Sequence, residues 1–291
     1  MSERISALTP KPIIQKQVMA NFPKRPRDSH KGLFGTVAVI GGAHGMIGAP
    51  LMAARAALKL GAGCVHVGLL AENAPGVDLL QPELMLHSAT AALQLPDVNV
   101  FAVGCGMGHD MAAQKILYDA LHSKASLVLD ADALNILALR PDLHTLLIAH
   151  EAACVLTPHP GEAAHLLACG TKEIQADRVA AVTQLARQLR CSVVLKGADS
   201  LCATRDGRLF VNTTGNPGMS SAGMGDVLTG MIAAFIAQGL TADNALLLAV
   251  HLHGAAGDAL SGQQATIGMT ATEVTEWARW LFNQWRLNGK S

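Results

Sequence analysis

The chain has 291 residues, of which 50% are hydrophobic and 15% charged, so it can build a large core and is not a disordered protein. Lys and Arg together number 22, as do Asp and Glu, so no excess of positive charge favours a nucleic-acid partner. The stretch richest in apolar residues, 227–240, is too short to span a membrane, and the N-terminus lacks an apolar signal segment. We therefore expect neither nucleic acid nor membrane as a partner.

The first two thirds of the chain alternate between two kinds of segment. Residues 1–30 are polar and proline-containing, and we interpret them as an N-terminal arm with one short helix. Strands are predicted over 36–41, 64–69, 98–103, 126–130, 153–156 and 192–196, and helices over 50–60, 112–122, 161–168 and 171–190. This alternation predicts a mostly parallel sheet with helices on both faces.

The pattern changes after residue 196. Segments 200–204 and 208–211 flank Arg205-Asp206-Gly207, which indicates a hairpin. A glycine-rich loop over 214–225 then leads into helices predicted over 226–238, 242–260 and 272–288. No charged or Pro/Gly/Ser-rich linker separates these segments, so we predict one α/β domain over residues 31–291 with a helical C-terminal third. The six cysteines form no CxxC pair or Cys/His cluster, which favours a reducing, cytoplasmic location.

The loop before the helix predicted at 226 carries the most informative motif, Gly223-Met-Gly225-Asp226. Its glycines let a ligand approach the backbone, and the start of the helix offers unpaired N–H groups and a positive dipole end to an anion. Asp226 is either the N-cap of this helix or a base beside a bound phosphate, because a carboxylate there is repelled unless it accepts a proton. Taken with the segments that follow, the motif favours a kinase-like enzyme. The chain has no P-loop motif.

Glycines also follow the first predicted strand. Gly42, Gly45 and Gly48 are spaced as GxxGxxG and would let a substrate lie against the backbone. They could instead form a degenerate dinucleotide fingerprint, with Glu72 as the ribose ligand, although the spacing differs from GxGxxG. A second glycine-rich loop, residues 104–108, follows another strand.

Polar side chains follow three further strands. His159 lies between two prolines, which favours a ligand contact, and Glu162 in the next helical turn could be a cap. Asp130 could position phosphate or serve Mg²⁺ indirectly, whereas Asp132 could cap a helix. Lys196 either meets phosphate oxygens or is a surface lysine at a strand end. Because ligands of doubly wound sheets bind at the carboxyl ends of the strands, these segments together predict one site.

Six motifs, in order over about residues 22–260, resemble those of the ADP-dependent NAD(P)H-hydrate dehydratases of the ribokinase-like superfamily. Such enzymes use ADP to eliminate water from hydrated NADH or NADPH, yielding AMP, phosphate and the restored cofactor. The motifs are HKG at 30–32 with VIGGA at 39–43, MIGAP at 46–50, DADALN at 130–135, LTPHPGE at 156–162, VLKGA at 194–198, and TGNPGM with GMGD between 214 and 226.

The resemblance assigns roles to particular residues. It implies that Asp226 is the base that activates the ring hydroxyl for phosphorylation, after which phosphate leaves. It places Glu162 where related kinases use a carboxylate for Mg²⁺. Ser200 stands where a threonine is usual and keeps the hydroxyl. The implied contacts with the hydrated dinucleotide are Ala49, Gly106, His159 and Asp226, and the implied contacts with ADP are Lys196, Gly197, Ala198, Asp199, Ser200 and Gly225.

The resemblance further implies Mg²⁺ and ADP as cofactor and co-substrate, action on the S epimer, and a homotetramer. Bacterial relatives often carry an N-terminal epimerase domain, and residues 1–30 are too short for one, so we expect a stand-alone dehydratase. Two alternatives are a small-alcohol kinase of the same superfamily, such as a vitamin-precursor kinase, and a non-catalytic dinucleotide-binding module. The Gly-Met-Gly-Asp helix start argues against the module, which has no need of it. His251 and His253 are two apart on a predicted helix and cannot share one face, so no metal pair is expected there.

Overall fold

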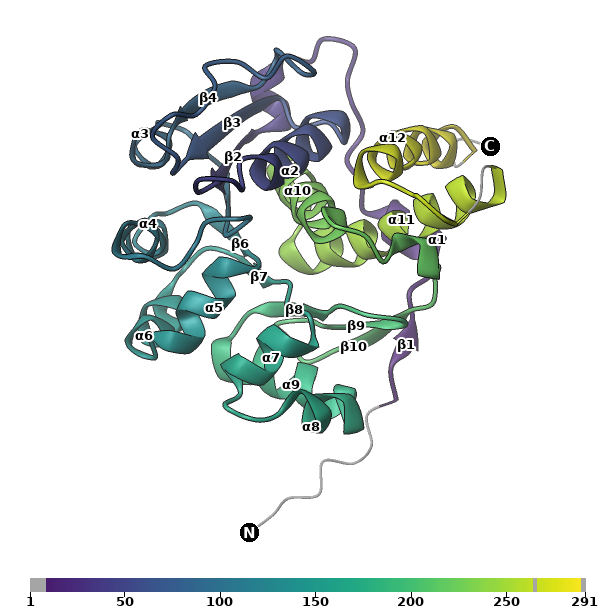
Figure 1. The fold of residues 1–291 in the computed structure, drawn as a ribbon. Coiled ribbons are helices and arrows are strands. Elements are labelled where there is room, and N and C mark those ends of the chain that lie inside the picture. Colours follow the sequence, from purple (N-terminus) through teal and green to yellow (C-terminus); the bar gives the residue numbers. More distant parts are fainter. Residues whose placement is uncertain (1–8, 264–265, 289–291) are drawn as a thin grey trace.

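The computed structural model describes residues 9–263 and 266–288, and the strands in this part of the chain form one ten-stranded sheet (Figure 1). Its order is β1-β10-β9-β8-β7-β6-β5-β2-β3-β4. All pairings are parallel except the two made by β9, which runs antiparallel to β8 and to β10. The strands are β1 (Lys11–Pro12), β2 (Thr36–Gly41), β3 (Cys64–Leu69), β4 (Met85–Ser88), β5 (Val100–Val103), β6 (Ser126–Leu129), β7 (Cys154–Leu156), β8 (Ser192–Leu195), β9 (Ser200–Ala203) and β10 (Leu209–Asn212).

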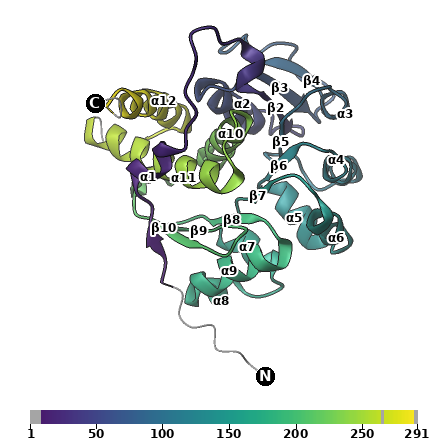
Figure 2. The ribbon, with the colours of Figure 1, turned by 180° about the vertical axis from the view of Figure 1, so that it is seen from behind.

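Helices cover both faces of the sheet (Figures 1 and 2), which confirms the predicted α/β class. One face packs against α1 (Gln15–Ala20), α2 (Gly48–Lys59), α10 (Met224–Ala237), α11 (Ala242–Gln263) and α12 (Ala271–Asn288). The other packs against α3 (Ala89–Leu93), α4 (Met111–Leu121), α5 (Asp132–Leu139), α6 (Asp142–Ala149), α7 (Pro160–Leu166), α8 (Thr171–Ala176) and α9 (Arg178–Leu189). Short 3₁₀ helices span Lys31–Phe34 and Pro217–Met219.

The two faces follow from the alternation of side chains along each strand. In β2, Val37 and Val39 join the core beneath α2 and α10, whereas Ala38 and Ile40 join the core on the opposite face. All four are fully buried, as expected for a central parallel strand. Helix α10 packs especially closely on α2, because a Cβ at Gly230 would collide with the carbonyl of Ala53. This packing holds α10 against α2.

Several predicted elements need correction. The single helix predicted over 171–190 is wrong: α8 and α9 are separate helices, and Asp177 divides them by accepting a hydrogen bond from the Ala180 amide at 2.9 Å as the N-cap of α9. The predictions also omitted β1, β4, α3 and α6, and they gave no bounds for α5, the helix that Asp132 was predicted to cap. The hairpin predicted around Arg205-Asp206-Gly207 is confirmed as β9 and β10.

The N-terminal arm is integrated into the sheet. Its residues Lys11 and Pro12 form β1, which pairs in parallel with β10, and the Ile13 amide donates to the Val211 carbonyl at 3.0 Å. Val18 of α1 is buried in the core shared with α10 and α11. The proposed boundary at residue 30 therefore does not separate an independent structural unit.

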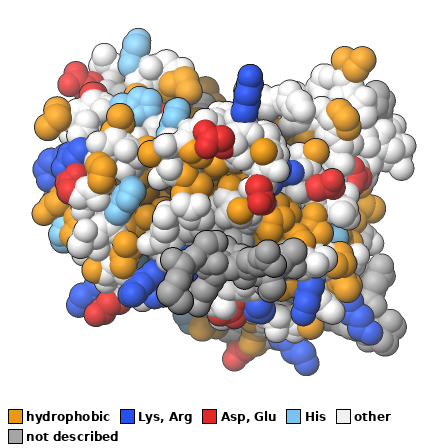
Figure 3. Space-filling model, turned by 90° about the horizontal axis from the view of Figure 1, so that it is seen from below, with side chains coloured by type: hydrophobic (Ala, Val, Ile, Leu, Met, Phe, Trp, Pro, Cys, Tyr) orange, Lys and Arg blue, Asp and Glu red, His pale blue; other side chains and the backbone are white. Residues whose placement is uncertain are grey.

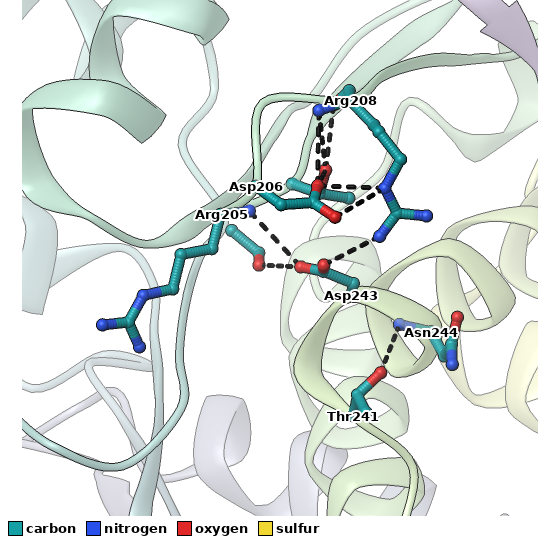
Figure 4. A network of polar contacts seen from close by, with 8 residues as sticks. Arg205, Asp206, Arg208, Thr241, Asp243 and Asn244 are labelled. Atoms are coloured by element: carbon teal, nitrogen blue, oxygen red, sulfur yellow. Dashed lines mark hydrogen bonds and ion pairs between the residues drawn. The ribbon is translucent and has the colours of Figure 1, made fainter.

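A polar network ties the β9–β10 turn to the start of α11 (Figure 4). Arg208 Nε lies 2.8 Å from Asp206 Oδ2, and Arg208 Nη2 lies 3.1 Å from Asp243 Oδ2. The Ser192 hydroxyl, at the first residue of β8, donates to the other Asp243 oxygen. The network therefore lies at the amino end of β8.

One face of the molecule carries charges of both signs. On the part of the surface visible in Figure 3, Lys and Arg side chains are interspersed with Asp and Glu. No helix within the described residues combines the length and apolarity needed to cross a bilayer.

Candidate active site at the carboxyl edge of the sheet

Two glycine-containing loops meet beyond the carboxyl ends of β2 and β5. The Gly42 amide donates to the Cys105 carbonyl at 3.0 Å, and the Ala43 amide donates to the Gly106 carbonyl at 2.7 Å. Gly106 has φ +58°, and a Cβ there would lie 2.8 Å from Met46 Cβ and 3.3 Å from Ala49 Cβ. Ala49 and Gly106, both predicted to contact the dinucleotide, are therefore direct neighbours in the fold.

Asp226 lies in the first turn of α10 but does not cap it. The N-cap is Gly223, with φ +90° and no side-chain cap, so the alternative that Asp226 is the N-cap is wrong. Val227 is the first residue whose amide bonds within this turn, to the Gly223 carbonyl at 3.0 Å. The amides of the three preceding residues lie at the positive end of the helix, where anions bind. Asp226 thus places a carboxylate next to a potential phosphate site.

A buried ion pair lies beside this helix start. Lys196 follows β8 and places Nζ 2.7 Å from Asp130 Oδ1, at the end of β6. Thr229 of α10 donates to the other Asp130 oxygen at 2.9 Å. A Cβ on Gly225 would lie 3.3 Å from Lys196 Nζ, so the ammonium reaches the start of α10. The interpretation of Lys196 as a surface lysine is therefore wrong, since only 20% of its side chain is exposed.

The charges in this cluster shift one another's pKa values. Burial alone would lower the pKa of Lys196, but the charges of Asp130 and then Glu162 outweigh it and raise that pKa. Burial would raise the pKa of Asp130, but Lys196 outweighs it and lowers that pKa. The pair is therefore ionised at neutral pH.

Asp226 behaves differently. Burial, followed by the charge of Asp130, raises the pKa of Asp226 to about 6. This carboxylate can both lose and accept a proton near neutral pH, as a general base requires.

Cys105 lies in the site, although the sequence predicted no role for it there. One ligand atom each of Cys105, Asp130 and Asp226 lies within 4.8 Å of the others, so the Cys105 thiol lies beside the Asp226 carboxylate. Burial and the two carboxylates raise the pKa of this thiol well above its usual value, so it remains a donor. Its place between Gly104 and Gly106 is the sequence signal that could have indicated the contact.

His159 and Glu162 form a reciprocal cap at the start of α7. His159 Nδ1 accepts from the amides of Gly161 and Glu162 at 3.0 and 3.2 Å, and Glu162 Oε2 accepts from the His159 amide at 2.7 Å. Because Nδ1 is an acceptor, the neutral ring carries its proton on Nε2, which lies 3.3 Å from Glu162 Oε1. The capping role of Glu162 is confirmed, and His159 keeps a half-exposed ring at the site.

A cavity of about 470 Å³ opens beside Lys196. Its lining includes all six residues predicted to bind ADP: Lys196, Gly197, Ala198, Asp199, Ser200 and Gly225. Arg178 supports this loop from α9, since Nη1 donates to the Ala198 carbonyl at 2.6 Å and Nη2 to the Leu195 carbonyl at 3.3 Å. The opposite wall comes from the loop after β10 and from α10 and α11, through residues 212–217, Met219, Ser220, Met224, Leu228, Val250, His253 and Gly254.

The residues predicted to contact the dinucleotide do not line this cavity, but they lie next to it. Asp226 follows Gly225 directly, and Ala49 and Gly106 adjoin Asp226 through Cys105. Glu162 Oε2 lies 3.9 Å from Lys196 Nζ and links His159 to the same cluster. The site thus has two sides, which meet at Lys196, Gly225 and Asp226.

The protein side chains at this junction do not form a ready divalent-metal site. Both Glu162 oxygens face donors on His159, and Asp130 is bound to Lys196 and Thr229. The ammonium of Lys196 lies among these carboxylates, and the thiol of Cys105 is a poor ligand for Mg²⁺. The assignment of Glu162 to Mg²⁺ stays a prediction.

The family model for NAD(P)H-hydrate dehydratase matches residues 37–279, which include every element of this site. The chain belongs to the NAD(P)H-hydrate dehydratase family. An ADP-dependent (S)-NAD(P)H-hydrate dehydratase from Neisseria meningitidis is 43% identical over 268 residues, covering 90% of each chain. The chain also matches bifunctional NAD(P)H-hydrate repair enzymes, of which it spans about half the length.

Solved structures agree with this family assignment. The ADP/ATP-dependent NAD(P)H-hydrate dehydratase from Bacillus subtilis, co-crystallised with ATP and Mg²⁺, has a TM-score of 0.84 at 28% identity and covers 96% of this chain and 100% of its own. A ribokinase-like superfamily protein from Enterococcus faecalis has the same TM-score at 26% identity, covering 98% of this chain and 99% of its own. The predicted ribokinase-like fold is confirmed.

Proposed function

We propose that this chain is a lyase that uses ADP to dehydrate the S epimer of hydrated NADH and NADPH. The observation that best supports this proposal is the junction at Asp226. There, a cavity lined by Lys196, Gly225 and the 197–200 loop adjoins a carboxylate with a pKa of about 6. One side of the junction would hold ADP and the other the hydrated dinucleotide.

The reaction would proceed in two stages. Asp226 accepts the proton of the ring hydroxyl, whose oxygen bonds to the β-phosphorus of ADP while the bond from that phosphorus to the bridging oxygen breaks. AMP leaves with the bridging oxygen. The C–O bond of this ester then breaks, phosphate leaves with the electron pair, and the neighbouring carbon loses a proton to solvent, which restores the double bond of the nicotinamide ring.

The surrounding groups suit the first stage. The amides at the start of α10 and the ammonium of Lys196 can stabilise the negative charge on the transferred phosphoryl group. Asp130 keeps Lys196 charged and directs its ammonium toward Gly225. The Cys105 thiol lies beside Asp226 and would help to orient the carboxylate without removing its proton-accepting role.

We propose that Mg²⁺ reaches the site with the phosphates of the nucleotide, because the carboxylates around Lys196 are occupied by donors. Mg²⁺ commonly binds proteins through substrate phosphates and water in this way, and it would neutralise phosphate charge. The B. subtilis relative was co-crystallised with ATP and Mg²⁺. No step above depends on a protein-bound metal.

The direct test supplies each epimer of hydrated NADH and NADPH with ADP, ATP or no nucleotide. Recovery of the absorbance of the reduced nicotinamide, with release of one phosphate per turnover, is expected with ADP and the S epimer. Asp226→Asn should abolish the recovery. Absence of recovery with every nucleotide, or accumulation of a stable phosphorylated small alcohol, would contradict the proposal.

Two further features remain predictions, namely the cytoplasmic location that the cysteines favour and the homotetramer that the family resemblance implies. The six cysteines are free thiols, which suits a reducing compartment. Light scattering coupled to size-exclusion chromatography would measure the assembly directly.

A further inference from the structure

The loop after β5, residues 104–108, joins the dinucleotide side of the candidate site to the base. Gly106 lies against Ala49, and Cys105 lies beside the Asp226 carboxylate. Three of the five loop residues are glycines with positive φ, so the loop would sample many conformations if nothing held it. The position of Gly106 therefore depends on the contacts that anchor the loop.

Backbone contacts anchor the first part of this loop. The Gly104 amide donates to the Ile40 carbonyl at 3.0 Å, and the next two carbonyls accept from the loop that follows β2. At the far end, the Gly108 amide donates to a side chain instead, Asp132 Oδ2 at 2.8 Å. Among the described residues, Asp132 is the only side chain that hydrogen-bonds to the backbone of residues 104–108. The end of the loop thus depends on this one carboxylate.

Asp132 also makes two further contacts with this region. His109 Nε2, directly after the loop, lies 2.9 Å from Asp132 Oδ1, and the Asp132 amide donates to the Gly104 carbonyl at 3.3 Å. The N-cap of α5 is Ala131, without a side-chain cap, so the alternative that Asp132 caps this helix is wrong. Asp132 therefore contacts both ends of the loop and uses both carboxylate oxygens there.

The turn before α5 directs two neighbouring carboxylates to different sides of the site. Ala131 has φ +48° and ψ −115°, a strained conformation that persists only where surrounding contacts fix it. Asp130 before it pairs with Lys196, and Asp132 after it holds the loop. Burial and the charge of Asp130 raise the pKa of Asp226, and the charge of Asp132 adds to this rise. Asp132 is thus close enough to the base to act on it.

We propose that Asp132 is a positioning residue that holds the 104–108 loop in the shape required to bind the hydrated dinucleotide. Its carboxylate fixes Gly106 and Cys105 relative to Asp226 before the substrate binds. A loop ordered in advance raises affinity, because less conformational freedom is lost on binding. The inference rests on the proposed function, since it requires the dinucleotide on this side of the site.

The test compares Asp132→Ala, which removes the acceptor, with Asp132→Asn, which keeps an oxygen for the Gly108 amide. The side-chain nitrogen of the asparagine can donate to His109, because a neutral imidazole can present Nε2 as an acceptor. Calorimetric titration with hydrated NADH alone measures binding on the dinucleotide side without turnover. Titration with ADP alone measures binding on the nucleotide side.

The two titrations should respond differently. Loss of a hydrogen bond to a charged group costs tenfold or more, so Asp132→Ala should bind hydrated NADH about tenfold more weakly than the wild type. Asp132→Asn should lose less than about threefold, because it keeps the acceptor. Affinity for ADP should be unchanged in both variants, because Asp132 does not line the nucleotide cavity.

Amide hydrogen exchange tests the loop without any ligand. The Gly108 amide should exchange about tenfold faster in Asp132→Ala than in the wild type, and Asp132→Asn should restore most of the protection. Asp110→Ala is the matched control, because Asp110 follows the same loop and accepts from the Ala113 amide at 2.8 Å as the N-cap of α4. It should lower thermal stability while leaving the affinity for hydrated NADH unchanged.

Wild-type affinity of Asp132→Ala for hydrated NADH, or unchanged exchange of the Gly108 amide, would each overturn the inference. An equal loss of affinity for ADP, or an equal loss in Asp110→Ala, would also overturn it, because either would reflect general destabilisation. In these cases recovery of the reduced cofactor by the wild-type enzyme would leave the proposed function intact. Failure of the wild-type enzyme to recover the cofactor with any nucleotide would instead overturn the proposed function, and the inference with it.

Discussion

Two clusters of charged side chains lie at opposite ends of β8. They differ in whether each carboxylate has a cation as its partner. At the amino end, Arg208 engages Asp206 and Asp243 near solvent. At the carboxyl end, Lys196 is buried with Asp130 and Glu162, and Asp226 lies beside them. The first cluster fixes a turn, and the second leaves one carboxylate without a cation of its own.

The pKa values express this difference. Hydrogen bonds from Arg208 and Thr204 lower the pKa of Asp206 to about 2, whereas burial and the charge of Asp130 raise the pKa of Asp226 to about 6. Asp206 is thus stabilised as a structural anion, and Asp226 is prepared to take up a proton. A carboxylate destabilised by its own fold is a strong indication of chemistry at that position.

Asp226→Asn should have the largest effect on activity, a loss of about 10²- to 10⁴-fold, because it removes the general base. It should also stabilise the fold above pH 6, on the order of 2 kcal/mol, because the charged form of Asp226 is disfavoured there. Cofactor recovery and thermal unfolding measure the two changes. Asp206→Asn is the paired control and should leave activity intact. A variant that stays fully active would remove Asp226 from the mechanism.

Lys196→Met should cost about 3–5 kcal/mol of unfolding free energy, because it leaves the buried charge of Asp130 without a partner. It should also weaken ADP binding. Adding Asp130→Asn should recover much of the stability but not the affinity, which separates the two roles of the lysine. Chemical denaturation and titration with ADP provide the measurements. Wild-type affinity in the double variant would mean that Lys196 serves the fold alone.

The pH dependence should differ in sign between the two clusters. Activity should fall about tenfold per pH unit below pH 6, as Asp226 becomes protonated. Because the pKa of Asp226 is raised in the folded state, protonation of Asp226 stabilises the fold at low pH. This stabilisation is lost as pH rises from about 4 to 6. The lowered pKa of Asp206 means that its contribution is lost as pH falls from about 4 to 2. Rate profiles and unfolding curves across this range would check both directions. A flat rate profile between pH 5 and 7 would be inconsistent with Asp226 as the base.

Arg208→Met should have the smallest effect, less than about 1 kcal/mol of stability, because its ion pairs are half-exposed and screened by solvent. Activity should be unchanged. Denaturation in low and high salt would measure the contribution, which should shrink as salt rises. A large loss of activity would show that the turn at the amino end of β8 communicates with the site.

The sequence was sufficient to predict the elements whose patterns are local. The strands at Thr36–Gly41 and Cys64–Leu69 were predicted with their observed bounds, because parallel strands form uninterrupted apolar runs. The break at Asp177 was missed because helical periodicity continues on both sides of it. The short strand β4 and helix α3 lack a strong periodic pattern of their own.

The site was predictable in its location but not in its contacts. Motif order placed Asp226 and Lys196 at one edge of the sheet, but it could not predict that Lys196 would pair with Asp130, which is 66 residues away. Contacts between distant segments require coordinates.

The pairing of β1 with β10 has a consequence for how the protein behaves at high concentration. Without Lys11 and Pro12, β10 would be an edge strand with unpaired backbone groups, a template for association between molecules. Pro12 places a residue with no backbone donor on the outermost strand, which discourages further strand addition. The N-terminal arm therefore protects the β10 edge of the sheet from pairing with other molecules. This role is separate from the chemistry of the candidate active site.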